Sequence, residues 1–170
     1  MEQAKNIRLL ILDVDGVLTT GALYYGSSGF AMRGFHIHDG MGIKLLQKAG
    51  IEVAIITSKK SDAVAKRLEE LGIRHAYLGQ EDKRPAYQEL KTKLQLDDTE
   101  IAYMGDDLPD LALLRRAGFA ASVPNAPAII QQYVDYITQK KPGKGAVREV
   151  CELILMAQGK LESVLQSYLD

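Results

Sequence analysis

The sequence predicts a three-layer α/β fold around a mainly parallel sheet. Short, continuous apolar runs such as residues 7–12 and 101–104 are typical of strands that are buried on both faces. These runs alternate with segments of helical periodicity, which favours parallel pairing through right-handed crossovers. No repeat, low-complexity tract or Pro/Ser-rich linker interrupts the alternation, so we expect a single domain over residues 1–170.

The expected elements follow one another in an order that suits this fold. The predicted strands are residues 7–12, 52–56, 76–78, 101–104 and 119–123. The predicted helices are residues 41–50, 61–71, 82–96, 108–117 and 126–133, with a last helix from Gly145 that breaks at Gly159. Gly72 is the expected C-cap of the second helix, because glycine adopts the left-handed conformation of that position easily. Ligands of such sheets bind beyond the carboxyl ends of the strands, so polar residues just after each strand are the candidate site residues.

One segment between the first strand and the first helix breaks the alternation. Residues 21–39 lack helical periodicity, and residues 22–25 and 30–33 flank the sequence Gly26-Ser27-Ser28-Gly29, a pattern typical of a β-hairpin. An isolated hairpin is only marginally stable in water. We expect this one to pack against a second copy of the chain, with packing on its own domain as the alternative. Its apolar residues are Leu23, Tyr24, Tyr25, Phe30, Met32 and Phe35.

Composition and charge exclude several classes of function. The 21 Lys and Arg nearly balance the 22 Asp and Glu, for a net charge of −1, so a general polyanion binder such as a nucleic-acid-binding protein is not expected. Every apolar run is far shorter than the ~20 residues of a membrane span. The N-terminus lacks the apolar core of a secretion signal, and one cysteine, Cys151, excludes an internal disulfide. We expect a cytoplasmic protein with no membrane partner.

Carboxylates follow two of the expected buried strands. Asp13 and Asp15 are one residue apart after the first strand, and they repel each other unless a cation or a raised pKa compensates. Asp106, Asp107 and Asp110 follow the strand at 101–104. If the two strands are parallel neighbours, Asp13, Asp15 and Asp106 converge, and an all-oxygen cluster is what Mg²⁺ prefers. Asp107 and Asp110 could instead cap a helix or support the metal ligands from behind.

Three other positions are candidates for binding an anion at the same edge. Thr57 and Ser58 follow a buried strand and precede a helix, where hydroxyls and amides bind anions but also simply cap helices. Lys83 comes one residue after Asp82, the expected N-cap, and a lysine there is unfavourable unless it neutralises an anion. A solvated side chain is the alternative for Lys83. Gly16 lacks a Cβ at a point where the backbone could approach a ligand closely.

Together these stretches resemble the haloacid dehalogenase superfamily, most of whose members are phosphatases. Residues 13–19 match its Asp-x-Asp-Gly-x-x-Thr motif, and Thr57, Lys83 and the stretch 105–110 follow in the expected order. The stretches 35–40, 79–83 and 143–149 further resemble the 3-deoxy-D-manno-octulosonate 8-phosphate phosphatases, so that the likeness spans about residues 7–149. The resemblance implies a Rossmann-like three-layer fold with a hairpin flap and no inserted cap domain.

This resemblance implies a Mg²⁺-dependent phosphatase that acts on 3-deoxy-D-manno-octulosonate 8-phosphate, in lipopolysaccharide sugar biosynthesis. Asp13 would attack phosphorus and form an aspartyl-phosphate. Asp15 would protonate the leaving sugar oxygen and then activate water, a role that calls for a raised pKa. Asp13, the main-chain carbonyl of Asp15 and Asp106 would hold Mg²⁺, while Thr57 and Lys83 would bind and balance the phosphoryl oxygens.

The resemblance also implies a set of contacts to the phosphorylated sugar acid. These residues are Gly16, His36, His38, Asp39, Gly40, Lys44, Ser58, Lys59 and Arg67. Lys59 and Arg67 could instead belong to a solvated helix face. Ser58-Lys59 stands where the family typically has Gly-Arg, and lysine keeps the charge but not the planar fork. Related phosphatases of nine-carbon, sialic-type sugar phosphates tend to carry Glu at position 59, so Lys59 favours the octulosonate. A sialic-type 9-phosphate phosphatase, another sugar-phosphate phosphatase and a non-catalytic oligomeric scaffold are the alternatives.

The quaternary structure that the resemblance implies is a homotetramer. Hairpins at residues 21–39 would assemble into a barrel, and a neighbouring subunit would close each active site. The C-terminal segment, residues 140–170, would reach a neighbour's site with the loop at 140–145. The alternative, from the residues alone, is that this loop is a solvated connection to the last helix.

Overall fold

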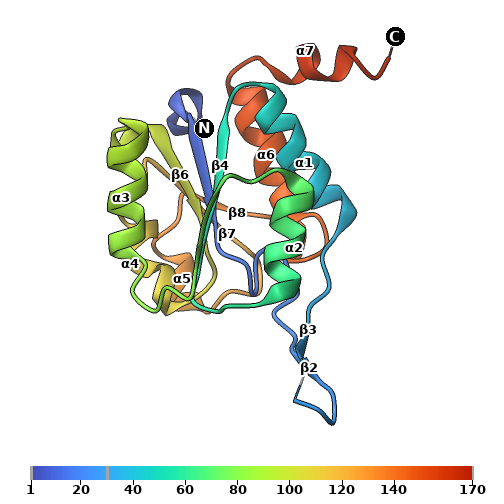
Figure 1. The fold of residues 1–170 in the computed structure, drawn as a ribbon. Helices are drawn as coiled ribbons and strands as arrows, with labels where there is room; N and C mark the ends of the chain where they lie inside the picture. The colour runs from blue at the N-terminus through green and yellow to red at the C-terminus, as the bar shows by residue number, and fades with distance from the viewer. Residues whose placement is uncertain (1, 30, 170) are drawn as a thin grey trace.

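A computed structural model describes residues 2–29 and 31–169 and places a six-stranded sheet at its centre (Figure 1). The strands are β1 (Leu9–Leu12), β4 (Glu52–Thr57), β5 (His75–Leu78), β6 (Ile101–Met104), β7 (Phe119–Ser122) and β8 (Tyr136–Ile137). Their order across the sheet is β5-β4-β1-β6-β7-β8, and every pairing is parallel. The predicted parallel sheet is therefore confirmed, with β8 as a strand that the sequence pattern did not indicate.

Helices cover both faces of this sheet. They are α1 (Ile37–Lys48), α2 (Asp62–Leu71), α3 (Arg84–Leu94), α4 (Leu111–Leu114), α5 (Ala128–Gln131), α6 (Ala146–Ala157) and α7 (Leu161–Gln166). Three short 3-10 helices are η1 (Gln3–Asn6), η2 (Asp98–Glu100) and η3 (Leu108–Asp110). In Figure 1, α1, α2 and α6 lie on one side of the sheet, and α3, α4 and α5 lie on the other. This arrangement confirms the three-layer prediction.

The central strand β1 is fully buried, which fixes where its carboxyl end lies. All four residues of β1 are inaccessible to solvent, because β4 and β6 flank the strand and helices cover both faces. Burial of each such aliphatic side chain contributes about 1.5–3 kcal/mol. In this register Leu12 pairs with Ile55 on one side and Met104 on the other. The residues that follow all three strands therefore meet at one edge of the sheet.

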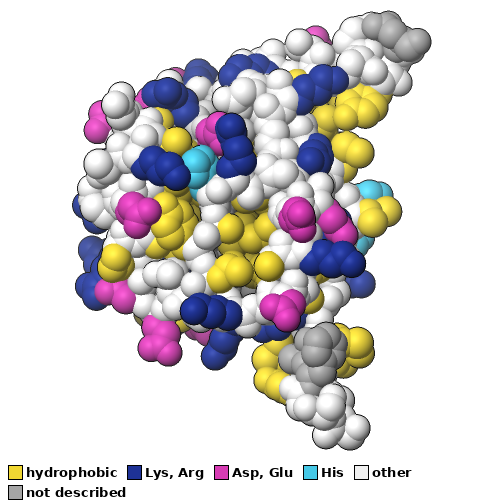
Figure 2. All heavy atoms as spheres, viewed as in Figure 1, with side chains coloured by type: hydrophobic (Ala, Val, Ile, Leu, Met, Phe, Trp, Pro, Cys, Tyr) yellow, Lys and Arg dark blue, Asp and Glu magenta, His cyan; other side chains and the backbone are white. Residues whose placement is uncertain are grey.

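The segment between β1 and α1 forms the predicted hairpin. Strand β2 (Tyr24–Tyr25) pairs antiparallel with β3 (Ala31–Met32), with Tyr24 opposite Met32. Phe30, which we included in the apolar set, lies outside the described residues. The hairpin extends away from the body (Figure 1), and Figure 2 shows its hydrophobic side chains on the surface. Tyr25 is 70% exposed and Met32 is 59% exposed, so packing of these side chains on the body of the same chain is not observed.

Helix α1 begins four residues earlier than the sequence pattern predicts. We expected the helix to begin at Met41, after a segment without helical periodicity, but Ile37 is already helical. His36 caps this helix, because its Nδ1 accepts a hydrogen bond from the main-chain N–H of His38 at 3.3 Å. Residues 37–40 therefore form the first helical turn.

Other helix boundaries also differ from the predictions. Lys83 and not Asp82 occupies the N-cap position of α3. The helix expected at 108–117 is divided into η3 and α4, and the one expected at 126–133 is reduced to α5. The predicted break near Gly159 is confirmed, since α6 ends before it and α7 begins after it.

Candidate active site

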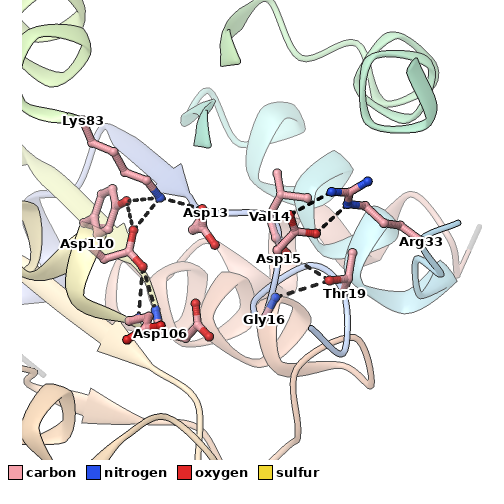
Figure 3. A network of polar contacts seen from close by, with 11 residues as sticks. Asp13, Val14, Asp15, Gly16, Thr19, Arg33, Lys83, Asp106 and Asp110 are labelled. Carbon is pink, nitrogen blue, oxygen red and sulfur yellow. Dashed lines mark hydrogen bonds and ion pairs between the residues drawn. The ribbon is translucent and has the colours of Figure 1, made fainter. Parts of the chain in front are cut away.

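The turn that follows β1 is held by its own hydrogen bonds. The carbonyl oxygen of Val14 accepts main-chain N–H groups from Val17, Leu18 and Thr19 at 3.0–3.2 Å. The Thr19 hydroxyl oxygen accepts the N–H of Gly16 at 3.3 Å (Figure 3). Thr19, the threonine of the sequence motif, therefore closes the turn that carries the two aspartates. This structural role is enough to account for a threonine at this position.

Gly16 is required in this turn for two reasons. Its φ of +91° lies in a region that side chains strongly disfavour. A Cβ at this position would also lie 2.1 Å from Oδ2 of Asp106. We expected a close approach to a ligand, and the structure shows that the absent Cβ makes room for a carboxylate of the site.

Three carboxylates meet beyond the ends of β1 and β6. Oxygens of Asp13, Asp106 and Asp110 all lie within 4.8 Å of one another. Oδ2 of Asp110 accepts the main-chain N–H groups of Asp106 at 3.0 Å and Asp107 at 3.2 Å. The Asp107 carboxylate turns back and accepts the N–H of Leu108 at 2.8 Å. Asp107 thus caps η3, which is one of the two roles expected for it. Asp110 orients the loop that carries Asp106.

Lys83 connects two of these carboxylates. Its Nζ lies 2.6 Å from Oδ1 of Asp13 and 2.6 Å from Oδ1 of Asp110, and its side chain is only 2% exposed. The Tyr103 hydroxyl donates a hydrogen bond of 2.6 Å to the same Asp110 oxygen. Lys83 is therefore not the solvated side chain of the alternative reading. Tyr103 was missed from the sequence, although a tyrosine in an otherwise aliphatic buried strand indicates a buried hydroxyl that needs a partner.

The electrostatics of this cluster favour a cation. Burial, together with repulsion from Asp13 and Asp110, raises the pKa of Asp106 to about 7. Burial and the Asp110 charge likewise raise the pKa of Asp13, against the opposing effect of Lys83. Burial disfavours the Lys83 ammonium, but the charges of Asp110 and Asp13 outweigh it, and the pKa of Lys83 is raised. The carboxylates therefore lack sufficient positive charge around them, which is typical of metal and catalytic sites.

A cavity of about 230 Å³ opens over the cluster. It is lined by Asp13, Asp15, Thr57, Ser58, Lys59, Lys83, Asp106, Asp107, Pro109 and Asp110. Thr57 is the last residue of β4 and is 2% exposed, while Ser58 and Lys59 lead into α2. A second cavity of about 280 Å³, lined by Gln47, Glu52 and Arg74 among others, contains none of the candidate site residues.

Known proteins share this sequence and fold. Residues 79–150 match the haloacid dehalogenase-like hydrolase family. The chain is 46% identical over 162 residues to the 3-deoxy-D-manno-octulosonate 8-phosphate phosphatase KdsC of Escherichia coli, which covers 95% of this chain and 86% of the relative. This chain belongs to the 3-deoxy-D-manno-octulosonate 8-phosphate phosphatase family.

Solved structures extend this family likeness to the whole fold. A haloacid dehalogenase subfamily III A hydrolase from Legionella pneumophila superposes with a TM-score of 0.96 at 51% identity, covering 99% of this chain and 92% of that one. The family member from Moraxella catarrhalis superposes with a TM-score of 0.95 at 46% identity, covering 98% and 96%. That protein was crystallised with a magnesium ion, a phosphate ion and 3-deoxy-D-manno-octulosonate.

Within the family motif, Asp15 has a partner that sequence reasoning missed. Arg33, which follows β3 of the hairpin, donates from Nε to Oδ1 of Asp15 at 2.6 Å and from its Nη2 to Oδ2 at 3.2 Å. The Arg33 side chain is only 7% exposed. Figure 3 shows Asp15 turned toward Arg33 and away from the cluster of Asp13 and Asp106. We had considered the hairpin only for its apolar side chains, which is why this arginine was not among the candidates.

Asp39, one of the expected sugar contacts, is buried within the fold. It is 1% exposed, and its carboxylate accepts the main-chain N–H groups of Gly145 at 3.3 Å and Arg148 at 2.9 Å. Asp39 therefore caps the N-terminus of α6 from the first turn of α1. Burial raises the pKa of Asp39 despite these hydrogen bonds.

Among the other expected sugar contacts, Ser58 and Lys59 line the cavity, whereas His36, His38, Gly40, Lys44 and Arg67 lie outside its lining. A Cβ on Gly40 would lie 2.4 Å from Nη2 of Arg67, so the arginine packs over this glycine. Nη1 of Arg67 also donates to Glu70 at 3.4 Å. The rings of His36 and His38 contact each other edge to face at 4.9 Å, and Lys44 is exposed on α1. Sugar binding by these residues stays a prediction.

Proposed function

We propose that this chain hydrolyses 3-deoxy-D-manno-octulosonate 8-phosphate to 3-deoxy-D-manno-octulosonate and phosphate in a Mg²⁺-dependent reaction. The observation that carries the proposal is the meeting of Asp13, Asp106 and Asp110 around Lys83, under one cavity at the sheet edge. The identity of the substrate is supported by the family relatives, whose names specify this reaction and whose likeness covers nearly the whole chain.

The residues present fit a magnesium ion. All the available donors are oxygens, as Mg²⁺ prefers. Both carboxylate oxygens of Asp110 already accept hydrogen bonds, so Asp110 supports the site from behind. Asp13, Asp106 and the main-chain carbonyl of Asp15 would hold the metal. When bound, Mg²⁺ offsets the charge of the carboxylates against that of the phosphate and orients the phosphoryl group.

We assign the role of nucleophile to Asp13. Its carboxylate would attack phosphorus to give an aspartyl-phosphate, with departure of the sugar oxygen. Lys83, at 2.6 Å from Oδ1 of Asp13, holds that carboxylate in position and balances the charge that collects on the phosphoryl oxygens. Thr57 and the main-chain amides beside Gly16 would bind those oxygens. Water would then cleave the aspartyl-phosphate, which releases phosphate and restores the Asp13 carboxylate.

We assign the proton transfers of both steps to Asp15. It lines the cavity two residues beyond the nucleophile, where it would protonate the sugar oxygen as the ester bond breaks. The same carboxylate would then accept a proton from the water that attacks the aspartyl-phosphate. Because both Asp15 oxygens accept hydrogen bonds from Arg33 in this arrangement, the pair must open and Asp15 must take a proton from water before it can protonate the sugar oxygen.

The proposed assembly is a cytoplasmic homotetramer formed through the hairpin. The exposure of Tyr24 and Tyr25, 60% and 70%, supports burial of this hairpin against other subunits. Gly143 donates its N–H to the carbonyl of Val17 at 3.2 Å, so the 140–145 loop lies beside this chain's own turn after β1. Entry of the C-terminal segment into a neighbour's site is part of the proposal. Over residues 2–29 and 31–169, none of the helices combines the length and the apolar character needed to cross a membrane. A mass near 18.7 kDa by light scattering would contradict the assembly.

Phosphate release from 3-deoxy-D-manno-octulosonate 8-phosphate tests the proposed reaction. Wild type with Mg²⁺ should turn over, and either EDTA or Asp13→Asn should reduce turnover by at least about a thousandfold, as expected for loss of a nucleophile. Asp97→Asn, an exposed carboxylate just before η2 at the opposite end of β6, is the matched control and should keep its activity. Activity that survives both treatments contradicts the mechanism. Equal turnover of a nine-carbon 9-phosphate contradicts the substrate assignment.

A further inference from the structure

Arg33 is a buried cation whose partner belongs to the active site. Its side chain is 7% exposed, and a buried guanidinium is tolerated only with a well-matched anion. Its two hydrogen bonds to Asp15, 2.6 Å and 3.2 Å long, use the planar fork that suits a carboxylate. The segment after β3 therefore brings a carboxylate-binding group against Asp15, which lines the cavity, although Arg33 itself lies just outside the lining.

The order of the charged groups matches the two ends of the substrate. In Figure 3, Lys83, Asp13, Asp15 and Arg33 follow one another across the view, with Lys83 at one end and Arg33 at the other. Phosphate belongs at the Lys83 end, beside the nucleophile. A sugar acid that carries its phosphate at one end and a carboxylate at the other would therefore extend past Asp15 toward Arg33.

The other cations near the cavity are less suited to the carboxylate. Lys83 already contacts two carboxylates. Arg67 packs over Gly40 and donates to Glu70. Lys59 lines the cavity, but its ammonium is a point charge without the fork. Arg33 is the guanidinium that already binds a cavity-lining carboxylate in the geometry required.

We propose that Arg33 binds the substrate's carboxylate in exchange for Asp15, and that this exchange releases Asp15 to act on the leaving oxygen. The proposal rests on the proposed function. A carboxylate replaces a carboxylate, so the buried guanidinium keeps a partner throughout. A phosphate ester without a carboxylate leaves Asp15 held against Arg33 and is hydrolysed slowly. Arg33 is thus a specificity determinant, and it acts on the reaction by positioning Asp15.

The test is the ratio of kcat/KM for two substrates, 3-deoxy-D-manno-octulosonate 8-phosphate and glucose 6-phosphate, which has no carboxylate. Arg33→Met should lower kcat/KM for the octulosonate ester by about 10- to 100-fold, the effect of losing a charge-assisted bidentate contact. It should leave kcat/KM for glucose 6-phosphate unchanged or higher, because Asp15 is no longer held. A fall of the ratio by about tenfold or more supports the exchange, and any smaller change overturns it.

Controls separate the proposal from general damage. A variant that merely disturbs the fold lowers both kcat/KM values together and leaves the ratio unchanged. Arg33→Gln keeps hydrogen-bond donors without the charge, and the same ratio is measured for it if the methionine variant does not fold. Arg74→Met removes an exposed arginine that pairs with Glu52 at 2.6 Å, away from the cavity, and should not alter the ratio. If the wild-type enzyme shows no preference for the octulosonate ester over glucose 6-phosphate, the proposed function is contradicted, independently of the result for the Arg33 variants.

Discussion

Replacing Lys83 with methionine tests whether this lysine stabilises the carboxylate cluster. Methionine is similar in length and fills the buried space without a charge. Lys83 lies 2.6 Å from an oxygen of Asp13 and 2.6 Å from an oxygen of Asp110. After the substitution, Asp110 keeps the Tyr103 hydroxyl and two main-chain N–H groups, while Asp13 loses its cation. The variant therefore buries two carboxylates with no compensating charge.

The cost follows from the two ion pairs. At 2.6 Å, each attraction is about 6 kcal/mol for an effective dielectric constant near 20, and desolvation of the ions offsets most of it. Removal of one partner from a buried ion pair costs about 3–5 kcal/mol. We expect Lys83→Met to lower the free energy of unfolding by that amount at pH 8 without metal. Burial raises the pKa of Asp13, so its folded form binds a proton more readily than the unfolded chain does. The loss should therefore be smaller at pH 5, where protonation removes the unpaired charge.

Urea unfolding followed by circular dichroism measures both effects. Wild type, Lys83→Met and the exposed-charge control Arg74→Met are compared in EDTA at pH 8 and pH 5. Mg²⁺ added at pH 8 should recover part of the lost stability, because a divalent cation takes over the compensation of the carboxylates. A loss below about 1 kcal/mol at both pH values would refute the reasoning, as would an equal loss at both.

Three further predictions concern the metal, the catalytic turn and the helix cap. Because burial raises the pKa of Asp106 to about 7, protons compete with Mg²⁺ for this carboxylate. The dissociation constant of Mg²⁺, measured by calorimetry, should therefore increase as the pH falls from about 8 to about 6, and a constant value contradicts this. Gly16→Ala places a Cβ 2.1 Å from Asp106 and should reduce kcat by about 100-fold or more, whereas Gly159→Ala, with nothing within 4 Å, should leave kcat unchanged; equal effects on kcat would contradict the steric argument. Asp39→Ala removes the acceptor that caps α6 and should lower the free energy of urea unfolding by about 1–2 kcal/mol, and an unchanged unfolding curve would show that the cap contributes nothing.

The sheet and the meeting of Asp13 with Asp106 could be predicted because both follow from local sequence pattern and topology, whereas the side chain of Asp15, expected in the same cluster, faces Arg33 instead. A continuous apolar run such as that of β1 is compatible with burial on both faces, and parallel pairing then brings the strand ends together. Asp13 and Asp106 each follow such a strand, so their meeting did not depend on knowing any side-chain contact. Lys83 was found through an electrostatic anomaly near a helix start, and the structure shows the anions that explain it.

Features that depend on tertiary contacts could not be predicted. The start of α1 was missed because residues 21–39 lack helical periodicity and Gly40, just before the predicted start at Met41, is a poor helix former. The structure explains this glycine by packing, since a Cβ on Gly40 would lie 2.4 Å from Arg67. Arg33 was missed for a similar reason, since its contact with Asp15 arises only when the segment after β3 lies beside the turn that follows β1.

The charges of the site account for its need of a divalent cation. The turn after β1 and its surroundings contain four carboxylates and two cations. The carboxylates are Asp13, Asp15, Asp106 and Asp110, and the cations are Lys83 and Arg33. Two negative charges remain in a largely buried region, and an incoming phosphate adds more. Protonation of Asp13 would disable the nucleophile that we propose, whereas a divalent ion balances the charge and leaves the Asp13 carboxylate ionised. If Arg33 changes partner from Asp15 to the substrate's carboxylate, its guanidinium keeps one carboxylate partner throughout.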